Sequence, residues 1–79
     1  MKNVPTIPAD APKTGEIFRH YKGDNYKVLD VALHSDDTWN VVYAPVYEGA
    51  VAKLFTRPLC EWREVVEWQG QKVERFVKV

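Results

Sequence analysis

Residues 18–26 concentrate side chains that could bind a ligand. These nine residues contain three aromatic rings, three potential cations and a glycine. In an expected strand, Arg19 and Tyr21 share one face, whereas His20 and Lys22 share the other. An arginine beside an aromatic ring can bind a carboxylate, a phosphate or a stacked base. This stretch is therefore the first candidate binding surface.

The same residues also have a structural interpretation. Arg19 would form an ion pair with Glu64 or Glu67, and Tyr21 would fill the core. Structural ion pairs resemble functional ones, so the sequence leaves both interpretations open.

The residues typical of metal sites and catalysis are few. His20 and His34 could meet across neighbouring strands near Asp24, and such a set can bind zinc or iron. No His-x-His or His-x-x-x-His spacing fixes two ligands locally, which favours hydrogen-bonded structural histidines and predicts no metal and no cofactor. Cys60, between Leu59 and Trp62, is expected to be a buried, inert thiol.

The sequence does not predict an enzyme. It has no glycine-rich phosphate loop. His34, Ser35 and Asp36 are consecutive on an expected turn and cannot adopt the geometry of a hydrolytic triad.

Aromatic residues make up 13% of the chain. A core this small can bury about half of them, so the others should reach the surface, where clusters mark binding sites. Trp39, Tyr43 and Tyr47 share one phase of a strand, with Tyr21 and Arg57 as possible neighbours. The alternative is that Trp39 and Tyr43 belong to the core.

Length and charge narrow the class of protein. Seventy-nine residues form at most one domain, and eleven basic residues balance eleven acidic ones. This balance argues against a protein that coats nucleic acid or an anionic membrane. We find no signal peptide or membrane span, and the lone cysteine fits a reducing compartment, so we expect a cytoplasmic setting.

The chain divides into an arm and a domain. Residues 1–14 contain Pro5, Pro8 and Pro12 and are expected to form a flexible arm, or alternatively one that lies along the domain or a partner. Residues 15–79 alternate turn signals with runs rich in branched and aromatic residues. These runs predict strands at about 17–22, 26–34, 39–47, 52–57, 64–68 and 71–77.

Two stretches modify this pattern. Residues 26–34 are apolar in both alternation phases, which indicates a strand covered on both faces or one whose faces are exchanged by a bulge. Residues 57–62 predict one 3₁₀ turn after Pro58. Together the elements predict an all-β, SH3-like, partly open small barrel of five or six short strands.

Short segments spread over about residues 15–76 form a recognisable set. They are Gly15, Phe18-Arg19-His20-Tyr21-Lys22-Gly23, Tyr26-x-Val28-Leu29, Ala32-x-His34-Ser35, Val41-Val42-Tyr43, Arg57-Pro58-Leu59, Glu64, Gly70 and Arg75-Phe76. In these segments the sequence resembles a bacterial domain-of-unknown-function family, number 1653. A Met-Phe pair of the family is replaced here by Glu61-Trp62. The resemblance implies a compact, mostly β domain of SH3-like size and no established activity.

Our first hypothesis is a non-catalytic module that binds an extended peptide or another protein. Free strand edges could also pair two copies into a homodimer. The alternative is nucleic-acid or nucleotide binding, with Tyr21, Tyr26 or Tyr43 stacking on bases and Arg19, Lys22 and Lys27 holding phosphate. The candidate binding residues are Arg19, His20, Tyr21, Lys22, Tyr43 and Arg57.

Overall fold

The computed structural model describes residues 6–46 and 54–79, which form seven strands and one short helix. The strands are β1 (Ile17–His20), β2 (Asn25–Leu33), β3 (Trp39–Pro45), β4 (Phe55–Pro58), β5 (Val65–Trp68), β6 (Gln71–Glu74) and β7 (Phe76–Lys78), and the helix is α1 (Leu59–Trp62). In these described ranges, no helix is long and apolar enough to cross a membrane.

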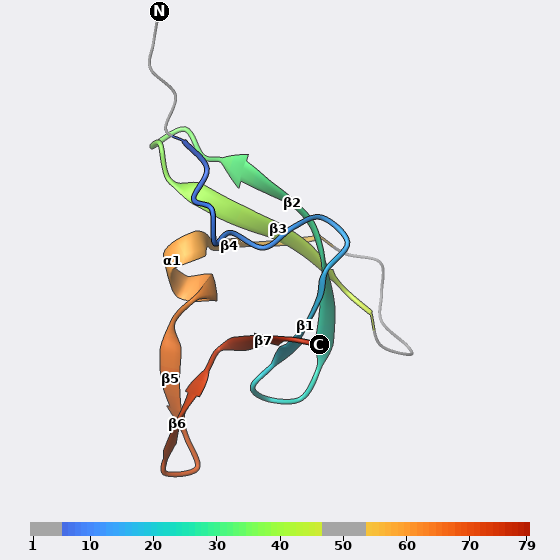
Figure 1. Ribbon diagram of the computed structural model, residues 1–79, viewed down its shortest axis with the longest axis vertical. Coiled ribbons are helices and arrows are strands. Elements are labelled where there is room, and N and C mark those ends of the chain that lie inside the picture. Colours follow the sequence, from blue (N-terminus) through green and yellow to red (C-terminus); the bar gives the residue numbers. More distant parts are fainter. Residues whose placement is uncertain (1–5, 47–53) are drawn as a thin grey trace, which may run out of the picture.

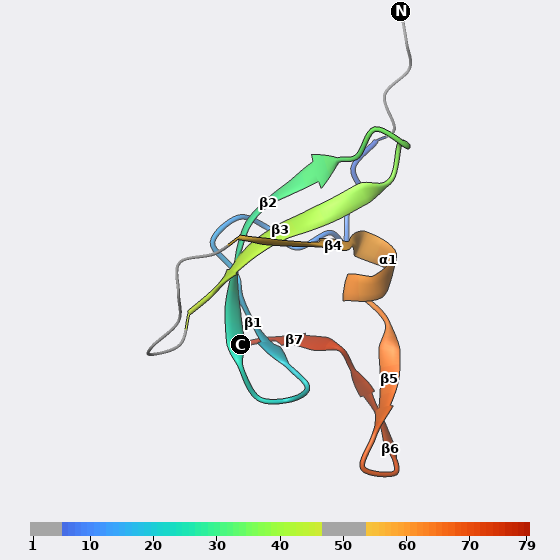
Figure 2. The same cartoon turned by 180° about the vertical axis from the view of Figure 1, so that it is seen from behind.

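The strands form two antiparallel sheets (Figure 1). The five-stranded sheet has the order β4-β3-β2-β1-β7, and β5 pairs only with β6. The β5–β6 hairpin projects away from the larger sheet, as the view from behind also shows (Figure 2). The two sheets do not close into one barrel. The predicted all-β, partly open fold is confirmed.

The long second strand contains the predicted bulge. Its register with β3 moves from Val28 opposite Tyr43 to Asp30 opposite Val42, which leaves Leu29 as the extra residue. Because one extra residue exchanges the faces of a strand, Val31 lies on the same inner face as Val28. Apolar residues from both alternation phases of this strand thus pack into one continuous core.

Two predicted turns are built from residues with positive φ. Gly23 has a φ of 113° in the turn between β1 and β2, and the His20 carbonyl accepts the Gly23 N–H at 2.7 Å. Gln69 and Gly70 join β5 to β6 with φ values of 51° and 78°, the left-handed pair that suits a two-residue hairpin. A further predicted turn, Glu48-Gly49, lies outside the described residues.

The predicted turn after Pro58 is α-helical rather than 3₁₀. The Arg63 N–H donates to the Leu59 carbonyl at 3.1 Å, an i to i−4 bond, and only the following bond, from Glu64 N–H to Glu61, has 3₁₀ spacing. Leu59 and Trp62 occupy the buried face of this turn.

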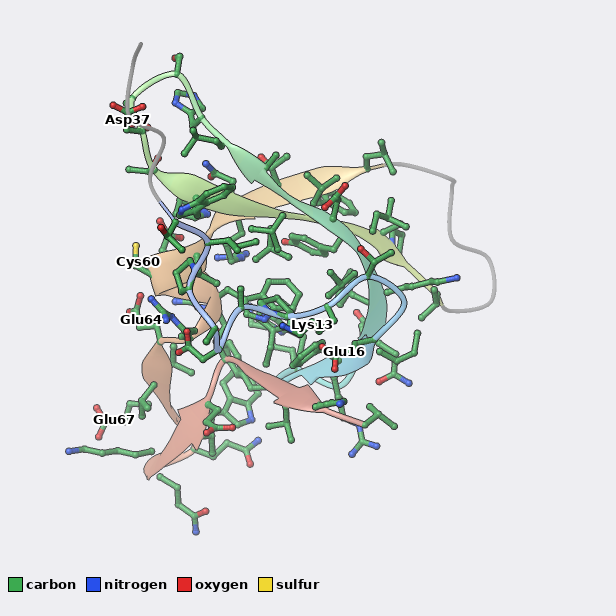
Figure 3. All side chains as sticks on the ribbon, turned by 45° about the horizontal axis from the view of Figure 1, so that its top comes forward. Lys13, Glu16, Asp37, Cys60, Glu64 and Glu67 are labelled. Atoms are coloured by element: carbon green, nitrogen blue, oxygen red, sulfur yellow. The ribbon has the colours of Figure 1, made fainter. Side chains whose placement is uncertain are left out.

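The prediction that Cys60 is buried is wrong. The thiol is exposed on the outer side of α1 (Figure 3). Residues three apart share one face of a helical turn, so Leu59 and Trp62 bury themselves and direct the intervening Cys60 outward.

The core is largely aromatic. Trp62 of α1 stacks on Phe76 of β7 with ring centroids 3.8 Å apart and an angle of 8° between the rings. Tyr43 meets both rings edge-on, and Phe18 meets Trp62 edge-on. Val28, beneath this cluster, has no exposed area. Stacking and edge-to-face pairs add to the free energy gained by burying ring area.

The last predicted strand is divided in two, which gives seven strands instead of five or six. At Arg75 the chain stops pairing with β5 and begins pairing with β1. The Arg75 N–H donates to the Glu64 carbonyl at 2.9 Å, and the Arg75 carbonyl accepts the Tyr21 N–H at 3.0 Å. A single residue thus links the hairpin to the larger sheet.

Part of the N-terminal arm lies against the domain. Ala11 is 6% exposed within the core cluster, and Pro12 is also buried. The Asp10 carboxylate accepts hydrogen bonds from Arg63 Nη1 at 2.8 and 2.7 Å. These contacts match the alternative of an arm that lies along the domain, as far as residues 10–12 are concerned.

We predict that Phe76→Ala lowers the free energy of unfolding by about 3–5 kcal/mol, because it removes a buried ring from the centre of the aromatic cluster. A loss of this size is comparable to the whole stability of so small a domain. Urea denaturation followed by tryptophan fluorescence measures it.

Val77→Ala is the matched control, since Val77 follows Phe76 on the same strand and is 50% exposed. We expect a change below about 1 kcal/mol there. Equal losses in the two variants would show that Phe76 is not central to the core.

Candidate functional site

Half of the sequence-predicted binding residues line one surface groove, called here the Tyr21–Trp68 groove. Its volume is about 250 Å³. The lining residues are Arg19, His20, Tyr21, Trp68, Val73, Glu74 and Val77. The groove therefore joins β1 and β7 of the larger sheet to the β5–β6 hairpin.

The strand register determines what faces this groove. Arg19 lies opposite Val77, and both point away from the core, because the adjacent Phe76 and Phe18 point into it. The hairpin supplies the other wall. Its position is fixed at Arg75, whose guanidinium lies 3.7 Å from the Glu64 carboxylate. Glu64 therefore pairs with Arg75, and not with Arg19 as the structural interpretation of the sequence suggested.

Two rings give the groove its aromatic character. Tyr21 and Trp68 meet edge-on with centroids 5.1 Å apart. Trp68 is 37% exposed, and Val77 beside it is half exposed. The Lys22 Nζ lies 5.8 Å from the Tyr21 ring centroid, which is within the range of a cation–π contact.

His20 connects the groove to the core. The centroid of its ring lies 4.4 Å from that of Tyr21 and 5.1 Å from that of Phe76. Its Nδ1 accepts the Lys22 N–H at 3.2 Å. Partial burial lowers the pKa of His20, and the positive charges of Arg57, Arg75 and Lys22 lower it further, while Asp24 opposes them. The folded protein thus favours a neutral imidazole.

Tyr43 and Arg57 lie apart from the groove, on the inner side of the sheet. Tyr43 is only 5% exposed, which corrects its expected place on an exposed aromatic surface. Arg57 Nε donates to the Tyr43 hydroxyl at 3.4 Å, and its Nη1 donates to Glu61 at 3.3 Å. The Arg57 guanidinium also lies 5.8 Å from the Phe76 ring centroid. Arg57 therefore links β4 to the core and to α1.

The two histidines do not meet. His20 ends β1 near the start of β2, whereas His34 follows the end of β2, and nine extended residues between them span roughly 25 Å. The His34 Nδ1 accepts the Asp36 N–H at 3.3 Å within its own turn. Among the described residues, no three histidine, cysteine or acidic side chains are grouped to hold a metal ion.

Trp39 is half-buried against the core, and Tyr47 lies outside the described residues. Sequence reasoning missed Trp68, Val73 and Val77. The available signal was an aromatic residue next to the Gln69-Gly70 turn, with Val73 as its diagonal neighbour on the same face of the hairpin.

Comparison with known proteins identifies the family of this chain. The profile of a family described as protein of unknown function, DUF1653, matches residues 16–78. The chain belongs to this family. A crystal structure of a DUF1653 protein from Bordetella bronchiseptica is 37% identical, covers 85% of this chain and 86% of its own, and superposes with a TM-score of 0.73. No curated protein matches the chain.

One departure from the DUF1653 pattern is explained by the structure. Where the family resemblance has Met-Phe, this chain has Glu61-Trp62. Trp62 keeps an aromatic ring at the second position and is 3% exposed, while Glu61 is half-buried and pairs with Arg57. The change therefore preserves the core and adds an ion pair at its edge.

We predict that His20 makes the stability of the protein depend on pH. Its folded pKa lies below the ordinary value of about 6.5, so the unfolded chain binds more protons as the pH falls through that value. Stability should therefore decrease between about pH 7.5 and about pH 5.5, above the range where carboxylates titrate. Urea denaturation at both values measures this decrease.

His20→Gln is expected to show a smaller decrease, because glutamine does not titrate. A direct check is the pH titration of the His20 ring signals by NMR. A ring that titrates at or above the ordinary value would contradict the prediction.

Proposed function

We propose that this DUF1653 domain is a non-catalytic binding module that takes an extended peptide segment of another protein into the Tyr21–Trp68 groove. The observation that carries the proposal is the groove itself, where Trp68 and Val77 remain exposed between two sheets. Exposed apolar groups gathered in one concavity are typical of interaction sites.

The chemistry of the lining supports a peptide. Tyr21 and Trp68 offer flat apolar surface at a low cost in conformational entropy, as aromatic residues do at interfaces. Arg19 and Glu74 provide charges of opposite sign, which can orient the polar backbone and side chains of a bound segment. The neutral His20 adds a ring nitrogen without a further charge.

Nucleic-acid binding is less well supported. Tyr43, one of the rings expected to stack on bases, is buried. Tyr26 faces the inner side of β2 with Val28, so the adjacent Lys27 points to the opposite side of the strand. Tyr26 and Tyr43 therefore do not join Arg19, Tyr21 and Lys22 on one exposed surface.

We place the module in the cytoplasm, because the exposed free thiol of Cys60 fits a reducing compartment. A second copy of the chain is the competing partner, since β4 and β7 end the larger sheet and could pair with another strand.

The proposal predicts that the full chain, immobilised, enriches binders from a phage-displayed library of random peptides. Trp68→Ala should weaken the selected peptides by about tenfold or more, because a central aromatic commonly accounts for about 2 kcal/mol of binding. Fluorescence polarisation of a labelled selected peptide measures the affinity.

Lys72→Ala is the matched control, because Lys72 lies opposite Glu67 and so on the other face of the hairpin from Trp68. It should leave the affinity unchanged. Peptides that bind Trp68→Ala as tightly as the wild type would refute the groove as the site. If sedimentation shows a dimer whose interface covers the groove, the ligand of the groove would be a second copy of the chain and not a peptide.

A separate measurement addresses nucleic acid. We expect no binding of a single-stranded oligonucleotide at about 50 mM salt, because the domain has no net charge with which to release counterions. Tight binding that weakens steeply with added salt would favour the alternative function.

A further inference from the structure

A second groove lies on a different part of the domain, between the start of β3, the end of β4, α1 and the N-terminal segment. Its volume is about 440 Å³, and we call it the Trp39 groove. Its apolar lining includes Trp39, Pro58 and Leu59, and Pro8 borders it from the N-terminal side. None of its lining residues belongs to the Tyr21–Trp68 groove.

The charged residues of this groove are mainly acidic. Asp36 and Glu61 line it, with side chains 61% and 47% exposed. The charge of Arg63, which also lines it, is compensated by two hydrogen bonds to Asp10. Glu61 has Arg57 as a partner. The Asp36 carboxylate accepts hydrogen bonds from Thr38, which lower its pKa and keep it ionised, and it also lies 3.0 Å from His34 Nδ1. The groove therefore favours a positively charged ligand group.

The chain itself brings a proline to this groove. Pro8 is the last member of a pattern in the sequence, Lys2-x-x-Pro5-x-x-Pro8, in which a base and two prolines are three residues apart. A polyproline II helix has three residues per turn, so side chains with this spacing lie along one ridge, about 9 Å apart. Such a ridge is complementary to a groove with the aromatic surface of Trp39 and an acidic edge.

We propose that the Trp39 groove binds a polyproline II segment of a partner protein in which a lysine or arginine precedes two prolines at successive intervals of three residues. The prolines pack against Trp39 and Pro58, and the base faces Asp36. The preformed helix loses little conformational entropy on binding. The Trp39 Nε1 is buried and has no hydrogen-bond partner in the described part of the chain, so a small rotation of the indole would let it donate to a free backbone carbonyl of the segment.

The test uses a synthetic peptide with the sequence of residues 1–9, which carries the required spacing. The receptor is the full chain with Pro5→Ala, so that its own segment lacks the pattern. In ¹H–¹⁵N correlation spectra we expect saturable shifts of the Trp39 indole signal and of the Leu59 and Cys60 amides. Of the three tryptophan indole signals, those of Trp39 and Trp68 report on the two grooves, and that of Trp62 reports on the core.

Two peptide variants examine the two halves of the recognition. Replacing both prolines by alanine should weaken binding by about tenfold, because the peptide loses its ridge and its preformed helix. Replacing the lysine by glutamate should weaken it by about threefold, as expected for an exposed charge pair. In a receptor that also carries Asp36→Asn, the difference between the lysine and glutamate peptides should disappear.

Trp68→Ala in the same receptor is the control for the other groove and should leave this binding unchanged. Shifts centred on Trp68, equal binding of the alanine peptide, or no saturable binding at millimolar peptide would each overturn the proposal. A wild-type dimer that dissociates when Pro5→Ala is introduced would assign the groove to a second copy and overturn the choice of a different partner.

Discussion

The stack of Trp62 on Phe76 is the contact on which the rest of the structure depends. It joins the only described helix to the last strand of the larger sheet, with ring centroids 3.8 Å apart. Tyr43, Phe18 and His20 then pack around these two rings. A domain without disulfide or grouped metal ligands in its described part must obtain its stability from such burial.

This inner packing determines what remains outside. Phe76 points into the core, so its neighbour Val77 must point out, opposite Arg19. Trp62 and Leu59 occupy the inner face of α1, so Cys60 faces solvent. The two grooves consequently lie where the hairpin and the helix meet the sheet, and not inside an open barrel. Both proposals of binding rest on these outward residues.

Much of the fold could be predicted from local pattern. The mixed apolar phases of residues 26–34 indicated either a strand covered on both faces or a bulge, and the structure has the bulge, at Leu29. The Gln69-Gly70 pair indicated the hairpin turn. The candidate site could be predicted only in part. Arg19, His20 and Tyr21 are consecutive, so local chain geometry keeps them together. Tyr43 and Arg57 come from other strands, where the sequence alone does not say which face is buried, and they support the core instead.

The sequence by itself determined the class of secondary structure, the turns and the aromatic composition of the core, because these follow from backbone preferences and from the periodicity of neighbouring residues. Only the tertiary structure decided which aromatic rings are buried and which are exposed. Trp62 and Trp68 are six residues apart and chemically identical, yet one is 3% and the other 37% exposed. The difference arises because burial depends on contacts between distant segments: Phe76 covers Trp62, while the turn at Arg75 holds the hairpin and Trp68 at the edge of the sheet.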